Sequence, residues 1–464
     1  MPPQANPGSF RDPSGQIFHF DDRIFRTVNP SAAADYEFAR DSGLIAELSR
    51  AGLLLAAEEV DRGILGSSAQ GASYLIEHPK LAFVSYPYEW SFMALRTAAV
   101  LHLDLQLAAL ERGASLSDAS AYNVQFIGAR PTFIDVLSLR RYREGEFWDG
   151  HSQFCQQFLN PLLLRALLGV PHNSWYRGSL EGIATEELAR LLPFRRKLSW
   201  NVFSQVVLQA RMQDMARGKS RSELAEAKKR QLPCQSYRNM LVQLRDWIAG
   251  LEPLKRQKST WHDYSAANTY NSEEAQAKHR FVADFVAATR PALLWDLGCN
   301  TGEYSETALQ SGARQVIGFD YDQGALDQAF LRARHKELAF LPLFLDAANP
   351  SPDQGWQQSE RMGLRSRATA DGLIALAFEH HLAIGRNVPL GQVVGWLTGL
   401  APAGVIEFVQ KTDTTIQQML AMRQDIFADY SEESFTAELQ GRARIVRSET
   451  ISAEGRRLFW YDRS

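Results

Sequence analysis

Three aspartates that each end an apolar segment are the residues of this chain best suited to bind a ligand. Asp296 ends the segment ALLWD, Asp320 follows twenty-four positions later at the end of QVIGFD, and Asp346 ends LAFLPLFLD. A carboxylate at the end of the second strand in such a series can accept both hydroxyls of a ribose. The three strand ends therefore predict one crevice that binds a nucleoside, with Asp346 and the following Ala347 near the exocyclic amine of adenine.

A glycine-containing turn follows the first of these aspartates. The segment DLGCNTGEYS places Gly298, Asn300 and Gly302 between an apolar strand and a helix. Glycine allows a tight turn and a close approach of ligand to backbone, and the following helix presents unpaired N–H groups to a carboxylate. Two glycines at such a turn are common in α/β proteins, and Asp296 could serve only to cap the loop. Asp320 and Asp346, at the ends of the next two strands, favour a binding site over a purely structural turn.

These segments resemble the class I S-adenosylmethionine-dependent methyltransferases. DLGCNTGEY is similar to their glycine motif and VIGFD to their ribose-binding motif, over about 200 residues from Lys255 to the end. The resemblance implies S-adenosylmethionine as cofactor, with the glycines beside its amino-acid portion, Asp320 on the ribose and Asp346 on adenine. The cofactor-binding residues expected are Asp296, Gly298, Asn300, Gly302, Asp320, Tyr321, Asp346 and Ala347. A dinucleotide-binding oxidoreductase is the rival, but no third glycine completes the G-x-G-x-x-G spacing.

A second polar group follows the fourth apolar segment, ADGLIALAF, and consists of Glu379, His380 and His381. Methyl transfer needs in-line placement of the reactants, and it needs a base only if the acceptor must lose a proton. An imidazole with a pKa near neutrality can serve as that base. All three are candidate catalytic residues, although either histidine could instead pack or bond to backbone. The next loop, with Arg386 and Asn387, could touch the acceptor.

Two further sets of residues have open roles. Trp261, Tyr264 and Tyr270 precede the glycine motif in a polar segment, where aromatic faces could meet a sulfonium cation or anchor the linker, and anchoring is favoured. Lys411 follows the fifth apolar segment and could pair with an anionic acceptor or be solvated, and solvation is favoured.

Alternating apolar strands and amphipathic helices must position these groups. Strands are expected near 292–296, 315–320, 339–346, 371–378 and 404–410. This alternation predicts an α/β fold with a Rossmann-like parallel sheet covered by helices. The last two segments, Ala443 to Ile451 and Arg457 to Asp462, leave no room for a crossover helix, so they predict an antiparallel hairpin at the sheet edge.

In the N-terminal half, Asp118, Asn123 and Asp135 have a spacing with chemical meaning. The segment SDASAYNVQFIGARPTFID resembles the catalytic loop and metal-binding strand of kinases, which bring a base and two metal ligands together. No metal site is expected unless this region binds a nucleotide, in which case Asn123 and Asp135 are the ligands. A glycine-rich loop and an early lysine are missing, and Arg26 stands about where that lysine would be sought. Asp118 and Asn123 could instead close a turn.

The elements expected around this motif form a helix-rich α+β domain, possibly kinase-like. They are a hairpin over 15–28 around Asp21 and Asp22, a helix within 32–60, a strand at 81–85, a helix from Phe92 to Glu111, and mostly helix over 150–250 with a basic, mobile break at 217–231. The domains expected are a disordered tail over 1–14, this domain over 15–254 and the methyltransferase domain over 255–464.

Composition limits the partners and the compartment. The net charge of −3 makes nucleic acid an unlikely partner, and no segment is expected to span a membrane or bind one. Cys155, Cys234 and Cys299 lie far apart without ligand spacing, which favours a reducing cytoplasm over a disulfide framework or zinc site. Nothing in the sequence fixes the oligomeric state.

The function predicted from the sequence is methyl transfer from S-adenosylmethionine to an unidentified small molecule or protein side chain. Two alternatives stay open. One is a module that binds the cofactor without catalysis, as a sensor or partner. The other is a bifunctional kinase and methyltransferase.

Overall fold

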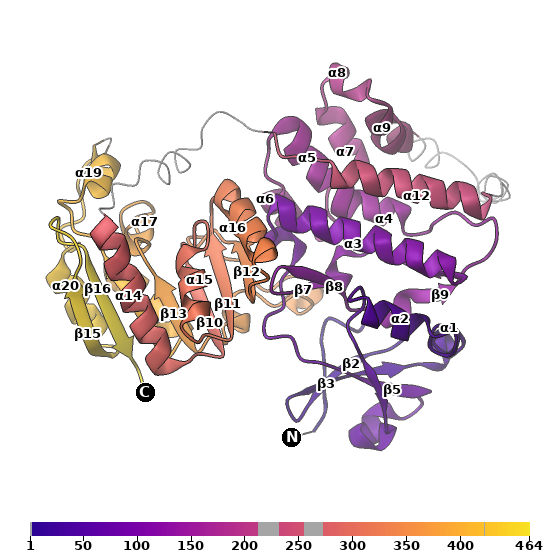
Figure 1. Ribbon diagram of the computed structural model, residues 1–464, viewed down its shortest axis with the longest axis horizontal. Coiled ribbons are helices and arrows are strands. Elements are labelled where there is room, and N and C mark those ends of the chain that lie inside the picture. The colour runs from indigo at the N-terminus through magenta and orange to yellow at the C-terminus, as the bar shows by residue number, and fades with distance from the viewer. Residues whose placement is uncertain (1, 212–231, 255–271, 422) are drawn as a thin grey trace. The chain divides into compact units, whose positions relative to one another are not determined.

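The computed structural model describes residues 2–211, 232–254, 272–421 and 423–464 (Figure 1). The chain forms two compact units, and each includes a short segment from within the sequence of the other. Unit 1 comprises Met1–Phe126, Pro131–Arg256 and Gln354–Arg361, and unit 2 comprises Ile127–Arg130, Gln257–Asp353 and Met362–Ser464. The aromatic residues Trp261, Tyr264 and Tyr270 and the predicted break at 217–231 lie outside the described residues.

Unit 2 is built on a seven-stranded sheet in the order β12-β11-β10-β13-β14-β16-β15. Its strands are β10 (Leu293–Leu297), β11 (Gln315–Asp320), β12 (Phe340–Phe344), β13 (Gly372–Ala375), β14 (Ala403–Phe408), β15 (Arg444–Thr450) and β16 (Arg457–Asp462). The first five are parallel, β16 is antiparallel to β14, and β15 is antiparallel to β16. The prediction of a parallel sheet with an antiparallel edge hairpin is confirmed, although β13 ends three residues earlier than expected, at Ala375.

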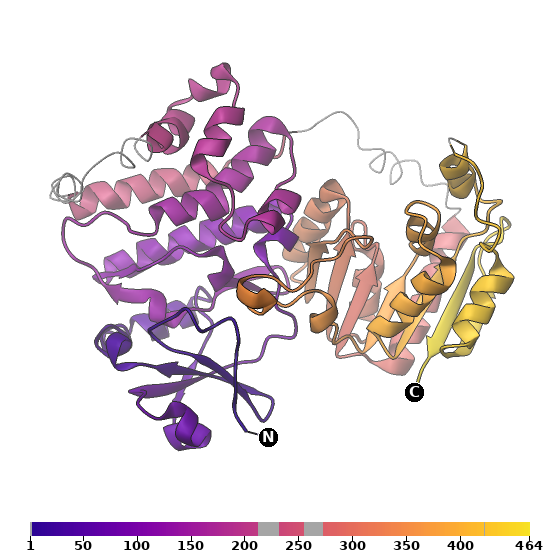
Figure 2. The same ribbon diagram turned by 180° about the vertical axis from the view of Figure 1, so that it is seen from behind.

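Helices cover both faces of this sheet, which explains why its strands are apolar along their whole length. The helices are α14 (Ser272–Thr289), α15 (Glu303–Gln310), α16 (Gln323–His335), η8 (Arg365–Arg367), α17 (Glu379–Ala383), α18 (Leu390–Leu400), α19 (Thr414–Leu420) and α20 (Glu432–Gln440). α14, α15 and α16 lie on one face, and α18 packs beside α20 on the other (Figures 1 and 2). Residues from the centre of the sheet, such as Trp295, Ile317 and Ile374, are fully buried between the layers.

Unit 1 begins with an antiparallel sheet in the order β1-β2-β3-β5-β4. Its strands are β1 (Gln4–Ala5), β2 (Ile17–Phe20), β3 (Arg23–Val28), β4 (Glu58–Val60) and β5 (Tyr74–His78), with α1 (Pro30–Asp41), α2 (Leu44–Arg50), η1 (Arg62–Ala69) and η2 (Pro87–Glu89) beside or after them. The hairpin predicted around Asp21 and Asp22 is confirmed, because both residues have positive φ angles, 47° and 61°, as a two-residue hairpin turn requires.

Three other predictions for this region are wrong. Residues 2–14 are not a loose tail, because β1 pairs with β2 and the Asn6 N–H donates to the Ile17 carbonyl at 2.7 Å. The helix expected within 32–60 is divided into α1 and α2 at Gly43, whose φ of 76° is left-handed, and it gives way to β4. No strand forms at 81–85, and the strand of this region is β5.

The rest of unit 1 packs around a long central helix, α3, whose predicted bounds, Phe92–Glu111, are confirmed. Around it lie β6 (Ala114–Leu116), η3 (Ala121–Asn123), β7 (Val124–Ile127), β8 (Arg130–Phe133), η4 (Val136–Ser138), β9 (Leu139–Arg141), α4 (His151–Phe154), η5 (Cys155–Leu159), α5 (Asn160–Leu168), α6 (Asn173–Gly178), α7 (Thr185–Leu191), α8 (Phe194–Lys197), α9 (Trp200–Val202), η6 (Phe203–Val207) and α12 (Cys234–Ala249), with η7 (Trp356–Gln358) from the later segment. The prediction of mostly helix over 150–250 is confirmed for the residues described.

By length and composition alone, α3 could cross a bilayer, with a mean hydropathy of 1.2 over an 18-residue window, and among the residues described it is the one such helix. However, 67% of that window is buried within the protein, and α3 packs along α12. Its apolar surface belongs to the core of unit 1.

The turn between β10 and α15 gives a direct test of this packing. Gly302 has a φ of 83°, and a Cβ there would lie 2.4 Å from Cε1 of Phe340. We expect Gly302→Ala to lower the free energy of unfolding by about 3 kcal/mol, from left-handed strain and overpacking together. Denaturant unfolding measures the change.

Gly399 of α18 is the matched control, because a Cβ there meets nothing within 4 Å. Gly399→Ala should leave stability unchanged or slightly higher. Equal losses from the two substitutions would contradict the structure of the turn.

Candidate functional site

The turn that links β10 to α15 alternates between ordinary and left-handed backbone. Gly298, Asn300 and Gly302 have φ angles of 76°, 48° and 83°. The Gly298 N–H donates to the Phe319 carbonyl at 2.8 Å, so the turn is fastened to the end of β11. A Cβ on Gly298 would lie 3.2 Å from the Phe378 ring, which leaves little room for a larger residue. The turn is compact and its backbone lies at the carboxyl edge of the sheet, as the sequence predicts.

The carboxylate of Asp320 lies beside this turn at the end of β11. Its Oδ2 accepts the Asn300 N–H at 2.8 Å, and its Oδ1 accepts the Asp322 N–H at 2.8 Å. Each carboxylate oxygen has a second lone-pair direction, so both can still accept a hydroxyl. The structure therefore fixes the orientation of Asp320, and burial raises the pKa of its carboxyl despite these hydrogen bonds.

Asp346, at the end of the third strand, and Tyr321 border the same edge. The Ala348 N–H donates to Asp346 Oδ1 at 3.1 Å, so Ala347 lies within a short turn closed by this carboxylate. Asp346 Oδ2 lies 3.9 Å from Nη2 of Arg386, a distant ion pair. Tyr321 is exposed, and its ring centroid lies 5.5 Å from that of Phe344. β11 and β12 are neighbouring strands, which brings Asp346 to the side of Asp320.

Asp296 is buried beneath the turn. Its Oδ2 accepts the Ser305 hydroxyl at 2.6 Å, which ties β10 to the first turns of α15. Burial raises the pKa of Asp296 to about 7, a net value that includes a lowering by the Ser305 hydrogen bond and a smaller rise from the nearby Asp320. This is the loop-supporting role that the sequence left open for Asp296, whereas Asp320 is half-buried at the end of β11.

The second polar group, after β13, contains a buried carboxylate–imidazole pair. Glu379 and His380 are both buried, and Glu379 Oε2 lies 2.9 Å from His380 Nδ1. The other oxygen, Oε1, lies 2.7 Å from the Tyr430 hydroxyl and accepts the Val409 N–H at 3.2 Å. Tyr430 also lies 2.7 Å from the Val409 carbonyl, and its single proton serves one of the two acceptors at a time.

This arrangement separates the roles of the candidate catalytic residues. Glu379 is held on both oxygens and orients His380 through Nδ1, which leaves Nε2 as the nitrogen available for proton transfer. No hydrogen bond to Nε2 forms within the part of the chain that the structure describes. His381 is half-buried with its ring centroid 4.2 Å from that of His380, and burial, aided by His380, holds its pKa well below the ordinary value.

Two residues that could have touched an acceptor have partners within unit 2. The Lys411 ammonium pairs with Asp425 Oδ2 at 2.9 Å, so the expectation of a merely solvated side chain is wrong. Asn387 accepts a hydrogen bond from Arg423, which also donates to the Ile384 carbonyl at 2.5 Å. The loop after α17 is thereby fastened to the residues that follow α19.

A buried ionic network behind the site was missed by the sequence analysis. Lys278 of α14 and Glu407 of β14 have side chains that are 1% and 0% exposed, and their charged atoms lie 2.7 Å apart. Arg456 lies 3.4 Å from the other Glu407 oxygen and forms a second ion pair with Asp413 at 2.6 Å. Glu407 Oε2 also accepts the N–H of Ala377 at 3.0 Å. The network thus holds the backbone immediately before Glu379.

One signal in the sequence could have revealed this network. Glu407 interrupts GVIEFV, a strand whose neighbours predict burial on both faces, and a buried carboxylate requires a cationic partner. The partners, Lys278 and Arg456, lie far away in the sequence, so only their packing could identify them. Arg456 precedes β16, and Lys278 lies on the helix that covers β14.

In unit 1, the structure brings Asp118, Asn123 and Asp135 together, as their spacing predicts. Asn123 Nδ2 lies 3.3 Å from oxygens of both aspartates, and the Ser138 hydroxyl lies 2.9 Å from Asp118 and 2.7 Å from Asp135. Burial raises the pKa of Asp118 to about 6, and the neighbouring Asp135 carboxylate adds to the rise. Ser138 is a member of the cluster that the sequence analysis missed.

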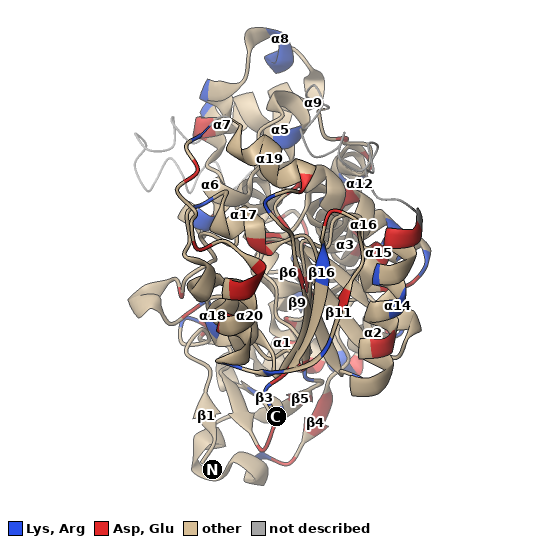
Figure 3. Cartoon of the chain, turned by 90° about the vertical axis from the view of Figure 1, so that its left-hand side faces the viewer, with Lys and Arg blue, Asp and Glu red and all other residues tan. Residues whose placement is uncertain are grey.

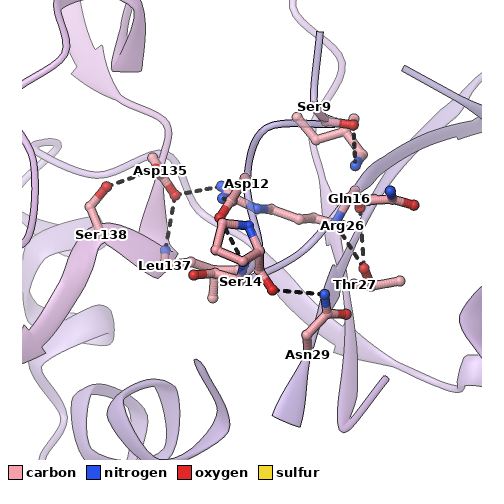
Figure 4. A network of polar contacts seen from close by, with 12 residues as sticks. Ser9, Asp12, Ser14, Gln16, Arg26, Thr27, Asn29, Asp135, Leu137 and Ser138 are labelled. Carbon is pink, nitrogen blue, oxygen red and sulfur yellow. Dashed lines mark hydrogen bonds and ion pairs between the residues drawn. The ribbon is translucent and has the colours of Figure 1, made fainter. Parts of the chain in front are cut away.

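Arg26 occupies the side of Asp135 that faces the hairpin sheet (Figure 4). Its guanidinium pairs with Asp135 Oδ1 and with Asp12 Oδ2, both at 2.5 Å. Asp12 belongs to the segment that the sequence assigned to a loose tail. Within the described residues no group of three or more acidic, histidine or cysteine side chains could hold a metal ion. The cluster is organised around a cationic side chain of the protein itself.

With this geometry established, the chain can be compared with known proteins. No family model matches it. The nodulation protein NoeA of Rhizobium meliloti (strain 1021) is 48% identical to it over 457 residues, which cover 98% of this chain and 96% of that protein. The chain belongs to the NoeA family. The sequence similarity extends over both units of this chain.

Several solved structures resemble part of the NoeA-family chain. The magnesium protoporphyrin IX methyltransferase ChlM from Synechocystis PCC 6803 with bound SAH is 19% identical, with a TM-score of 0.32, over 44% of this chain and 93% of its own. The N-methyltransferase NodS from Bradyrhizobium japonicum WM9 is 11% identical, with a TM-score of 0.31, over 41% and 97%. WbdD is 15% identical, with a TM-score of 0.29, over 47% of each chain.

The buried Lys278–Glu407 pair makes a specific prediction about stability. Lys278→Met removes the ammonium nearest to the buried Glu407 carboxylate and leaves it only the longer ion pair with Arg456, so we expect the free energy of unfolding to fall by about 3 kcal/mol. Lys411→Met, which breaks the half-exposed pair with Asp425, should cost less than about 1 kcal/mol. Denaturant unfolding of both variants compares the two losses.

A double variant distinguishes charge from packing. If the loss comes from the charge of Glu407 that Lys278 no longer balances, adding Glu407→Gln to Lys278→Met should recover part of it. A double variant that is less stable than Lys278→Met would refute the assigned role of the pair.

Proposed function

We propose that unit 2 of this NoeA-family chain is a methyltransferase that uses S-adenosylmethionine and methylates a small molecule or a protein side chain. The observation that carries the proposal is the joint placement of the turn at 298–302 and the Asp320 carboxylate at the carboxyl ends of parallel strands. In open α/β sheets this edge is where ligands bind. The oriented carboxylate with free lone pairs fits a ribose better than it fits a phosphate, which it would repel.

The residues present fit the cofactor in three places. Asp320 is oriented by the backbone N–H groups of Asn300 and Asp322 and would accept the ribose hydroxyls with its remaining lone pairs. The turn at 298–302 brings backbone and the start of α15 to the position expected for the amino-acid carboxylate. Asp346, beside exposed Tyr321, can accept the exocyclic amine of adenine. When bound, S-adenosylmethionine supplies an activated methyl group on a positively charged sulfur.

The chain's own residues then control the acceptor. His380 Nε2 takes the proton that a hydroxyl or amine acceptor loses, while Glu379 fixes the tautomer through Nδ1 and stabilises the positive charge that develops on the ring. Tyr430 and the Val409 N–H hold Glu379, so Glu379 acts through His380 and not on the acceptor. His381, whose pKa is held low, stays neutral beside His380 and adds no competing charge.

The two alternatives make different demands. A module that binds the cofactor without catalysis has no use for the tethered Glu379–His380 pair, which is a costly arrangement to bury. A kinase activity in unit 1 would need Asp135 free to bind a metal ion, whereas Arg26 already neutralises it. We therefore favour methyl transfer over both.

Cofactor binding tests the proposal directly. Isothermal calorimetry of the full chain should detect S-adenosylmethionine and S-adenosylhomocysteine, and Asp320→Ala should weaken both at least tenfold, because the ribose loses its two charge-assisted hydrogen bonds. Asp284→Ala removes an exposed carboxylate that pairs with Arg447 and should leave the affinity unchanged. Absence of heat with either ligand, in protein shown to be folded, would end the proposal.

Turnover separates catalysis from mere binding. With labelled cofactor and a fractionated cell extract as the source of acceptor, His380→Ala should reduce methyl incorporation by about 10²–10⁴-fold without weakening the cofactor, because it removes the general base. Tyr430→Phe should give a smaller loss and shift the pH profile, since it loosens Glu379. Binding of the cofactor without label transfer by the unmodified chain would favour the sensor alternative.

A further inference from the structure

Unit 1 exposes a group of large apolar side chains between α7 and η6. Phe194, Leu198 and Trp200 are 75%, 67% and 74% exposed, although they lie within seven residues of one another. Many other aromatic residues of the unit, such as Trp90 and Phe158, are fully buried. Single exposed apolar residues need no explanation, but a contiguous group of this size indicates a surface for interaction.

Three consecutive basic residues lie among these apolar ones. Arg195, Arg196 and Lys197 stand between Phe194 and Leu198, and none of them forms an ion pair among the residues described. Figure 3 shows basic residues on α8. The acidic residues nearest in sequence, Glu186 and Glu187, belong to the first turn of α7. We call the segment from Phe194 to Trp200 the α8–α9 tip.

The tip lies at an extreme of its own unit. Within unit 1, α8 and α9 are at the end opposite the β2-β3-β5 sheet, and both views show them projecting beyond α5 and α7 (Figures 1 and 2). The residues that hold the tip in place are buried ones, Leu192 and Val202, on either side of it. The tip therefore exposes its apolar and basic side chains between two buried residues.

We propose that the α8–α9 tip binds the surface of a membrane that contains anionic phospholipids. The indole of Trp200 and the ring of Phe194 have the size and polarity that suit the boundary between headgroups and acyl chains. The three consecutive basic residues suit the negative charge of the headgroups. This is association with a bilayer surface, and it revises the expectation from composition that the chain has no membrane partner.

The charges favour this occupant over the others. In a symmetric contact between two copies of the chain, the Arg195–Lys197 clusters would face each other, and like charges at an interface are costly. A nucleic acid strand would satisfy the cations and stack on Trp200, but it would leave Leu198 in water. An anionic bilayer offers both a negatively charged layer for the basic residues and an apolar layer beneath it for Phe194, Leu198 and Trp200.

Sedimentation with sucrose-loaded vesicles tests the proposal on the full chain. Vesicles of phosphatidylcholine with phosphatidylglycerol should bind the protein, and vesicles of phosphatidylcholine alone should bind it at least tenfold less. The triple variant R195E/R196E/K197E should abolish binding to the anionic vesicles, since each basic residue contributes roughly fivefold. High salt should weaken the binding of the unmodified chain.

The double variant Phe194→Ser with Trp200→Ser tests the apolar contribution and should bind at least tenfold more weakly. Trp356→Ser is the matched control, because Trp356 is also exposed in unit 1 but lies outside the tip, and it should bind as the unmodified chain does. Quenching of tryptophan fluorescence by brominated lipids should be lost with Trp200→Ser and kept with Trp356→Ser. Circular dichroism confirms that each variant is folded.

Three outcomes would overturn the proposal. One is failure of the unmodified chain to bind anionic vesicles at low salt. Another is binding that is unaffected by the tip variants. The third is that protein which does not bind vesicles has a different partner. That partner would be a second copy, seen as a Trp200-dependent dimer in light scattering, or a tightly bound single-stranded oligonucleotide.

Discussion

Left-handed backbone at Gly298, Asn300 and Gly302 allows β10 to turn into α15 at the edge of the sheet. The turn depends on the neighbouring strands, because the Gly298 N–H is fastened to Phe319 at the end of β11 and Gly302 fits against Phe340 of β12. The acidic residues of the site stand at the ends of the same two strands: Asp320 is the last residue of β11, and Asp346 follows β12. The geometry of the proposed cofactor site is therefore a consequence of parallel strands whose carboxyl ends share one edge.

The position of the proposed catalytic residues depends on a second constraint, the burial of Glu407 within β14. Its ion pairs with Lys278 and Arg456 offset the cost of a carboxylate between two layers of helices. Glu407 also accepts a hydrogen bond from the N–H of Ala377, which has a φ of 48°. Ala377 lies where the chain leaves β13 and enters α17. Stability and function are thus connected, because the network fixes the backbone that presents Glu379 and His380.

The sequence predicts unit 2 well because its information is local. Strand segments, the glycine turn and the acidic strand ends each lie within a few residues, and the register of a parallel sheet brings them together. The spacing of Asp118, Asn123 and Asp135 was informative for the same reason. Lys278, Arg456 and Tyr430 could not be found, since their partners are distant in sequence. The first 14 residues were misjudged because pairing of β1 and the contact of Asp12 with Arg26 are tertiary.

The most direct test of the central claim is a crystal structure of the full chain with S-adenosylhomocysteine. The account predicts density across the carboxyl ends of β10, β11 and β12, with both ribose hydroxyls within hydrogen-bond distance of Asp320 and the sulfur facing the side of His380. Ligand density in unit 1, or a nucleoside in unit 2 whose ribose makes no contact with Asp320, would contradict it.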